Sequence, residues 1–375
     1  MPPHTISTPD KSASPATPPA VRKPSFISRF QRVSPVEKIL FTQHLGLMLK
    51  GGISVSRALG ILADQTKKIR FQMVLRDLQK IVEQGTPLSD GMNHYPHIFG
   101  SIFVSMIRAG ESSGMLEETL KILTLQSKKE HQLLSKVKGA LTYPVIVLFM
   151  MIMIGIGMIV FIIPKITAVF EEVNATLPLP TRILIGISKL IVNNGILSAV
   201  TAIAACIAFG IILKQPWGKK FFDALSLRLP IAGSIVKKIN IARFARNFSS
   251  LMQANLPITQ ALQLTGDTLK NTLYKNAITS FESSITKGTP LAEAMKQFPS
   301  VFPATITEIT HVGEETGKLD TTLAELADFY EEDIEQIMHN LPSILEPAMM
   351  LLLGISVGGM AVAIIMPMYS LSSQL

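Results

Sequence analysis

The sequence repeats itself, and this duplication constrains the fold more than any other feature. Shifting the chain by 203 residues aligns residues 41–164 with residues 244–367 without a gap, and 25 of the 124 aligned positions are identical. Gly-Thr-Pro-Leu, for example, stands at 85–88 and again at 288–291. A repeat of this length is one structural unit used twice, so a fold for one copy must also serve the other.

Long stretches without charge predict a membrane protein. Only 17% of the residues are charged, against about 25% in soluble globular chains. Residues 145–163, 196–213 and 348–366 carry no charge and are long enough to cross a bilayer as helices. With the prolines that flank the outer two, we expect transmembrane helices at 143–164, 196–213 and 347–367. The middle segment is rich in alanine, and a buried core helix is its alternative interpretation.

The positions of lysine and arginine predict the orientation. Four lysines lie within 128–138 and three within 214–220, whereas residues 368–375 carry no charge. Because cationic loops stay on the cytoplasmic side, we expect the N-terminus and residues 214–346 to be cytoplasmic. The 165–195 loop and the C-terminus are then external.

Periodic apolar residues predict helices within each copy. Phe41, Leu45, Met48 and Leu49 follow the i, i+4, i+7, i+8 spacing of a helix, and no strand-like alternation of useful length appears. Each copy is expected to be a bundle of five or six helices. The last helix runs toward the bilayer, where the proline that opens the apolar segment kinks or restarts it. The fold class is therefore an all-α membrane protein with two repeated cytoplasmic helical bundles and three transmembrane helices.

The predicted domains follow from this plan. They are a disordered Pro/Ser/Thr-rich tail at 1–35, a first bundle at 36–142, transmembrane helices at 143–164, 196–213 and 347–367, an external loop at 165–195, a basic linker with the second bundle at 214–346, and an external tail at 368–375. The first 35 residues contain no apolar signal segment. A spacer is the expected role of this tail, and a docking motif is the alternative.

Each copy carries a glycine-rich turn with a glutamate inside it. The residues are Gly110, Glu111 and Gly114 in the first copy, and Gly313, Glu314 and Gly317 in the second. Two glycines permit a left-handed helix end and a tight corner between helices. The glutamate is expected to accept backbone N–H groups at the start of the next helix. A contact with a partner protein is the alternative role.

The two copies differ in charge. Residues 1–142 hold 19 basic and 10 acidic side chains, whereas residues 247–346 hold 5 basic and 14 acidic ones. An acidic run lies on the helix before the third apolar segment. Its members are Asp328, Glu331, Glu332, Asp333 and Glu335. Solvated faces are the simplest explanation, and the sharper hypothesis is that the bundles pair with each other or with a partner of opposite charge.

No motif for catalysis, a cofactor or a metal emerges from the sequence. Residues 313–319 resemble a phosphate-binding loop but have one residue too few between the glycines and no Ser or Thr after the lysine. The apolar segments carry no ionisable residue, which disfavours a pump or coupled transporter. Gly155, Gly354 and Gly358 suit close packing between spans.

Taken together, these residues resemble the inner-membrane platform proteins of type II secretion and type IV pilus systems (GspF/PilC type). The similarity covers about 37–370. Its carriers include the glycine turns at 109–116 and 312–319, Tyr143-Pro144, Leu177–Arg182, Leu229–Gly233 and Ala242–Phe244. The Pro/Ser/Thr tail departs from the ordered N-terminal segment that many members carry.

This resemblance implies a non-enzymatic adaptor without cofactors in the bacterial inner membrane. It implies as partners a cytoplasmic assembly ATPase, pilin or pseudopilin subunits, other inner-membrane assembly proteins, lipid and further copies of the chain, with no nucleic acid. Type IV pilus biogenesis is preferred, and type II secretion is the alternative. A transporter or channel and a membrane-anchored enzyme are more remote interpretations.

Overall fold

The computed structural model describes residues 33–165, 167, 179–229 and 232–372, in which every regular element is a helix and none is a strand. Its helices in the first half are α1 (Pro35–Lys50), α2 (Val55–Gln65), α3 (Ile69–Glu83), α4 (Leu88–Asn93), α5 (Ser101–Ser113), α6 (Leu116–Gly157) and the π-helix η2 (Met158–Ile162). Those in the second half are α8 (Leu179–Asn193), α9 (Gly195–Lys214), α10 (Pro216–Arg228), α11 (Ala232–Gln253), α12 (Ile258–Thr268), α13 (Thr272–Ile285), α14 (Leu291–Lys296), α15 (Ala304–Glu315) and α16 (Leu319–Ser372).

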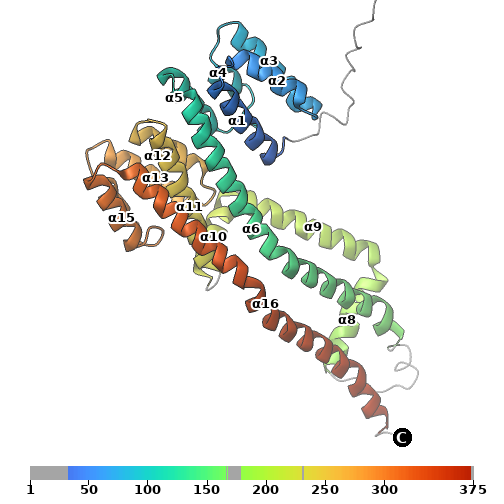
Figure 1. The fold of residues 1–375 in the computed structure, drawn as a ribbon. Helices are drawn as coiled ribbons and strands as arrows, with labels where there is room; N and C mark the ends of the chain where they lie inside the picture. Colours follow the sequence, from blue (N-terminus) through green and yellow to red (C-terminus); the bar gives the residue numbers. More distant parts are fainter. Residues whose placement is uncertain (1–32, 166, 168–178, 230–231, 373–375) are drawn as a thin grey trace, which may run out of the picture.

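The two sequence copies fold into the same order of helices. Helices α1–α5 with the start of α6 form the first bundle, and α11–α15 with the start of α16 form the second (Figure 1). In each bundle the first helix packs along the long last helix. The prediction of an all-helical, duplicated chain is therefore confirmed.

The first helix shows how the sequence specifies this plan. Ser34 accepts a hydrogen bond at the start of α1, while its own backbone N–H donates to Glu37 Oε2 at 2.8 Å, which forms a capping box. Phe41 and Leu45, one turn apart, are buried. Phe41 packs edge-on against Phe71, with ring centroids 5.7 Å apart. The helix is thus stabilised at its start by polar groups and along its length by the core.

The long helices run without a break from the bundles into the apolar segments. Both α6, through Pro144, and α16, through Pro347, remain helical, so of the predicted kink or restart at these prolines the restart is wrong. Each proline removes one backbone hydrogen bond of the ladder. Large apolar side chains along these parts are exposed in the single chain, for example Phe161 at 70% and Ile355 at 71%.

Two helices, not three, are long and apolar enough to cross a membrane among the described residues. They are Leu116–Lys165 and Leu319–Gly359. The predicted middle span coincides with α9, in which only Ile203–Ile212 counts as a shorter apolar helix. Its small side chains and its shorter apolar stretch give it the weakest signal of the three, as the alanines of the sequence indicate.

Several predicted boundaries fall differently in the structure. Residues 1–32 of the expected tail lie outside the described residues, and α1 already begins at Pro35. The expected external loop contains helix α8, and α16 continues to Ser372 through most of the expected external tail. The basic linker is helical as well, because it comprises α10 and the first turns of α11.

The glycine turns join α5 to α6 and α15 to α16 in the same way. Gly114 and Gly317 have φ of +72° and +66°, in the left-handed region that favours glycine. A Cβ at Gly110 would lie 2.5 Å from Thr119 Oγ1, so this glycine allows the two helices to approach closely. Gly313 is close-packed too, though less tightly, since a Cβ there would lie 3.2 Å from Leu319 Cα.

The glutamate of each turn binds a helix start, but not the one predicted. Glu111 accepts the backbone N–H of Leu88 at 2.5 Å and of Ser89 at 2.9 Å, at the start of α4 rather than of α6. Glu314 accepts those of Leu291 and Ala292 at the start of α14, at the same distances. The expectation of the next helix is therefore wrong. Because α4 and α14 begin after proline and are one or two turns long, this carboxylate supplies the cap that their own sequence lacks.

A valine at Gly114 should destabilise the chain, because a β-branched residue is strained at positive φ by about 1–2 kcal/mol. We expect a lower midpoint of thermal unfolding for Gly114→Val than for Gly114→Asn, since asparagine tolerates the left-handed region. The measurement is thermal unfolding of the full chain in detergent. Equal midpoints for the two variants would contradict the role assigned to this turn.

Replacing Glu111 by glutamine should loosen α4. The amide retains one acceptor oxygen for two N–H donors, which leaves a partly buried donor unsatisfied at a cost of about 1–3 kcal/mol. We expect faster hydrogen exchange at the amides of Leu88 and Ser89 in Glu111→Gln. The matched control is Glu118→Gln, an exposed carboxylate in the first turn of α6. Unchanged exchange at the start of α4 would refute the capping role.

Candidate functional site

The two bundles meet along α6. This helix of the first bundle contacts α11 and α16 of the second, and α5 contacts α12 (Figure 1). The apolar parts of α6 and α16 leave the bundles toward the same end of the molecule. The contact region between the bundles, called the junction below, therefore lies along the parts of α6 and α16 that precede the apolar segments.

Arg246 of α11 is the centre of the junction. Its side chain is 9% exposed, and its Nε and Nη2 donate to the two carboxylate oxygens of Glu331, each at 2.9 Å. Nη2 also donates to Asp328 Oδ1 at 2.5 Å. Both carboxylates belong to α16, so a planar guanidinium fork binds α11 to α16 within the second bundle.

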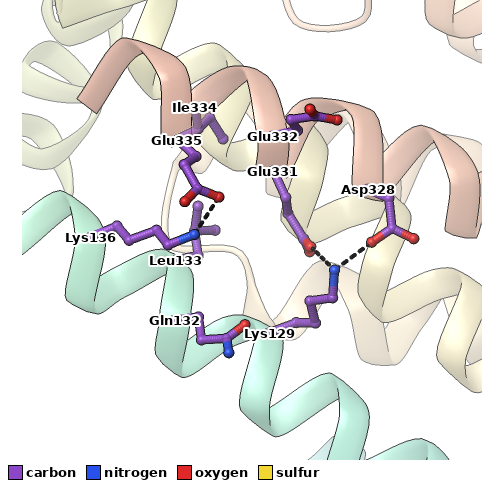
Figure 2. Close-up of a pocket in the computed structure, with 9 residues that line it drawn as sticks. All are labelled: Lys129, Gln132, Leu133, Lys136, Asp328, Glu331, Glu332, Ile334 and Glu335. Atoms are coloured by element: carbon purple, nitrogen blue, oxygen red, sulfur yellow. Dashed lines mark hydrogen bonds and ion pairs between the residues drawn. The ribbon is translucent and has the colours of Figure 1, made fainter. Parts of the chain in front are cut away.

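Lys129 extends this network to the first bundle. Its Nζ lies 2.7 Å from Asp328 Oδ1 and 3.4 Å from Glu331 Oε2, as Figure 2 shows. Arg246 and Lys129 thus share the same pair of carboxylates. Two cations and two anions balance, which is the condition for holding Arg246 and Glu331 in largely buried positions.

The pKa values reflect this pairing. Burial would lower the pKa of Arg246, but Glu331 and Asp328 raise it above its ordinary value. Partial burial would raise the pKa of Asp328, yet Lys129 and Arg246 hold it below its ordinary value. Arg246 and Asp328 therefore stay charged at neutral pH, and their ion pair persists across the physiological range.

Further polar contacts flank the network. The amide of Gln126 on α6 donates to Asn247 Oδ1 on α11 at 2.9 Å, in a buried position, and Asn247 donates onward to Thr268 Oγ1 at 2.9 Å. Lys136 of α6 pairs with Glu335 of α16. A row of polar contacts therefore connects α6 to the second bundle.

A crevice of about 310 Å³ opens beside these pairs, between α6 and α16 (Figure 2). Its lining residues are Lys129, Gln132, Leu133, Lys136, Asp328, Glu331, Glu332, Ile334 and Glu335. Each lysine in the lining faces a carboxylate. The arrangement is suited to joining two helices, because both lysines of α6 are paired with carboxylates of α16.

The predicted acidic run lies largely at the junction, as the hypothesis that the two bundles pair with each other expects. Asp328 and Glu331 bind Arg246 and Lys129, Glu335 binds Lys136, and Asp333 binds Lys238 at 2.6 Å. These four carboxylates are therefore engaged within the chain. Glu332 is exposed, and no ion pair of it is found in the described part of the chain; in Figure 2 it points away from α6.

Other predicted residues lie away from the junction. A Cβ built at Gly354 or Gly358 would meet no atom within 4 Å, and Gly155 is partly exposed, so the described chain itself does not pack against them. Among the described residues no group of three or more His, Cys, Asp or Glu side chains is placed to hold a metal.

Sequence reasoning missed Arg246, Gln126 and Asn247. Side chains of these polar types are usually exposed. These three are buried only because a helix that is far away in the sequence packs against them. One signal was available. Phe244 and Phe248 are one turn apart and define the buried stripe, and Arg246 stands between them on a helix that must face two neighbours.

Comparison with known proteins addresses the chain as a whole. The family described as type II secretion system (T2SS), protein F, matches residues 41–164 and 244–367, the same two segments as the repeat. The type IV pilus assembly protein PilC of Myxococcus xanthus is 32% identical over 353 residues, covering 93% of this chain and 84% of the relative.

Two further relatives represent both kinds of machine. The type IV pilus assembly protein PilC of Thermus thermophilus is 32% identical over 336 residues, which is 90% of this chain and 82% of the relative. The type II secretion system protein F of Aeromonas hydrophila is 27% identical over 330 residues, 88% of this chain and 84% of the relative. With both repeats matched and relatives aligned over most of their length, the chain belongs to the type II secretion system protein F family, which includes the type IV pilus assembly proteins of the PilC kind.

Proposed function

We propose that this chain is the inner-membrane platform protein of a type IV pilus machine, an adaptor that couples a cytoplasmic assembly ATPase to the addition of pilin subunits. The observation that carries the proposal is the likeness to pilus assembly proteins at 32% identity over 90% or more of the chain. Type II secretion remains the alternative, supported by the secretion protein at 27% identity.

The geometry supports an adaptor that transmits force. Helix α6 has 42 residues and α16 has 54, which at 1.5 Å per residue gives lengths of about 63 and 81 Å. Since neither helix breaks at its proline, a push or rotation applied to a bundle moves the apolar segment with it. The Arg246 network joins the bundles, so both long helices move together.

The membrane arrangement belongs to the same proposal. We place the apolar segments 143–164, 196–213 and 347–367 in the inner membrane, the second of them on α9, with the N-terminus cytoplasmic and the C-terminus external. The proposal is supported by the exposed apolar side chains of α6 and α16 and by the lysines at both cytoplasmic ends. Helix α10, with Lys219 and Lys220, then lies beside lipid headgroups.

The proposed partners follow from the role. The assembly ATPase contacts the cytoplasmic bundles, and pilin subunits and other assembly proteins meet the apolar helices. The chain itself catalyses no reaction and binds no cofactor, metal or nucleic acid. The glycine turns with Glu111 and Glu314 serve structure in this scheme, and Gly155, Gly354 and Gly358 are left for contacts with other membrane helices.

Co-purification tests the proposal directly. In mild detergent, from the native host, the chain should bring down a hexameric assembly ATPase together with pilin-like proteins, identified by mass spectrometry. Pseudopilins in place of pilins would favour type II secretion. Recovery of the chain alone, under conditions that preserve other membrane complexes, would contradict the platform role and direct attention to flux through liposomes.

Breaking the network should uncouple the bundles. Arg246→Gln leaves Glu331 largely buried without its partner, and removing one member of a buried pair costs up to about 3–5 kcal/mol. We expect faster hydrogen exchange in α11 and α16 and a loss of surface pili at normal protein level. The matched control is Arg108→Gln, which breaks an exposed pair with Asp90. Normal piliation of Arg246→Gln would refute mechanical coupling through this residue.

A further inference from the structure

Helix α10 has an apolar side that the described part of the chain leaves uncovered. Trp217, Phe221 and Leu225 stand four residues apart and therefore form one stripe along this helix. Their exposed fractions are 76%, 58% and 41%. Leu229, directly after the helix, is 48% exposed and continues the stripe. A contiguous apolar patch of this kind marks a surface that binds a partner or a membrane.

The opposite side of α10 is fixed by its neighbours. The helix contacts α9 on one hand and α11 and α13 of the second bundle on the other, and Figure 1 shows it between them. Phe222 packs edge-on against Phe209 of α9, with ring centroids 5.6 Å apart. Asp223 Oδ2 accepts the backbone N–H of Thr272 at 2.8 Å and its hydroxyl at 2.9 Å, at the start of α13. These contacts hold α10 to both neighbours and leave the apolar stripe facing outward.

Helix α10 also begins directly where the apolar helix α9 ends. Only Gln215 separates the two helices. Gly218 lies so close to the last turn of α9 that a Cβ on it would clash with the backbone O of Ile212. Near this end of α9, Phe209 and Ile212 are themselves exposed. The uncovered apolar surface of α9 therefore continues onto the next helix of the chain.

The charges of α10 indicate what covers the stripe. Residues 214–229 hold four basic side chains and a single acidic one, Asp223, which is engaged with the second bundle. Lys219 and Lys220 are exposed, and no ion pair of either is found among the residues that the structure describes. Unpaired cations on a helix with an apolar stripe are typical of helices that lie on an anionic lipid surface.

We propose that α10 lies in the plane of the membrane surface and anchors the second bundle there. Its apolar stripe enters the boundary between headgroups and acyl chains, and Lys219 and Lys220 bind anionic headgroups. With 13 residues the helix is about 20 Å long, too short to cross a bilayer. Trp217 suits the boundary because its ring is apolar and its indole N–H finds polar partners. The anchor rests on the proposed membrane arrangement, in which α9 is a span.

The depth of Trp217 in the bilayer tests the proposal. It is the single tryptophan of the chain, so the fluorescence of the unmodified protein reports on α10 alone. The full chain is reconstituted with phosphatidylglycerol and phosphatidylcholine, the latter brominated either near the headgroup or near the end of the acyl chain. Bromine quenches a tryptophan that it touches. We expect strong quenching by the shallow bromine and several-fold weaker quenching by the deep one.

Two variants calibrate the depth. Trp217→Phe/Ile154→Trp moves the tryptophan to an exposed position in the middle of the apolar segment of α6, where the deep bromine should quench more strongly. Trp217→Phe/Leu47→Trp moves it to an exposed position of α1 in the first bundle, where neither bromine should quench.

The outcomes separate the anchor from the membrane arrangement. If Ile154→Trp is quenched and Trp217 is not, the anchor is refuted, the stripe belongs to a protein contact or to water, and the platform role is unaffected. Preferential quenching of Trp217 by the deep bromine also refutes it, because α10 would then be part of a span. Absence of quenching at both positions contradicts the membrane arrangement and the anchor together.

The preference for anionic lipid is a second measurement. With the shallow bromine carried by phosphatidylglycerol instead of phosphatidylcholine at equal fraction, the relative affinity around Trp217 should favour phosphatidylglycerol about fivefold. Lys219→Gln/Lys220→Gln should abolish this preference. The matched control is Lys50→Gln/Lys80→Gln, two exposed lysines of the first bundle, which should retain it. Equal quenching by both lipids in the unmodified chain would contradict the binding of anionic headgroups.

Discussion

The arrangement of the two bundles depends on one buried guanidinium. Arg246 can be largely excluded from water only because Glu331 and Asp328 accept its donors, and these carboxylates in turn hold Lys129 of the other bundle. A buried charge without partners is costly. The packing of α11 on α16 and the docking of α6 on both are consequently linked, since each supplies a charge that the others require.

The two copies share the interactions that form each bundle and differ at the positions where the bundles meet. The carboxylate of Glu111 caps α4, and the carboxylate of Glu314 caps α14 at the same distances. This interaction within each bundle is therefore the same in both copies. The positions that face the neighbouring bundle changed instead. Gln126 corresponds to Phe329 and Glu331 to Lys128 across the repeat, so the residues that join the two bundles differ between the copies.

Much of the fold was predictable from the sequence, and the junction was not. Helical periodicity and the gapless repeat predict the bundles. Both signals can be read from the sequence, because periodicity concerns residues one turn apart and the repeat is found by aligning the chain with itself. The target of Glu111 was missed because it lies 23 residues back in the chain. The role of the acidic run was open because a carboxylate on a helix looks the same whether its partner is Arg246 or another protein.

Helices α6 and α16 connect each bundle to its apolar segment without a break, so the junction between the bundles also bears on the apolar segments. Proline in the interior of a helix removes one hydrogen bond, yet α6 and α16 continue through Pro144 and Pro347. An apolar stretch follows each proline, and because an unsatisfied backbone group is costly in apolar surroundings, the helix remains the favoured state there. A bundle and its apolar segment are therefore connected by one continuous helix. The ion pairs of Lys129 with Asp328 and Glu331 join the two helices in their N-terminal thirds, so the junction lies on the bundle side of both apolar segments.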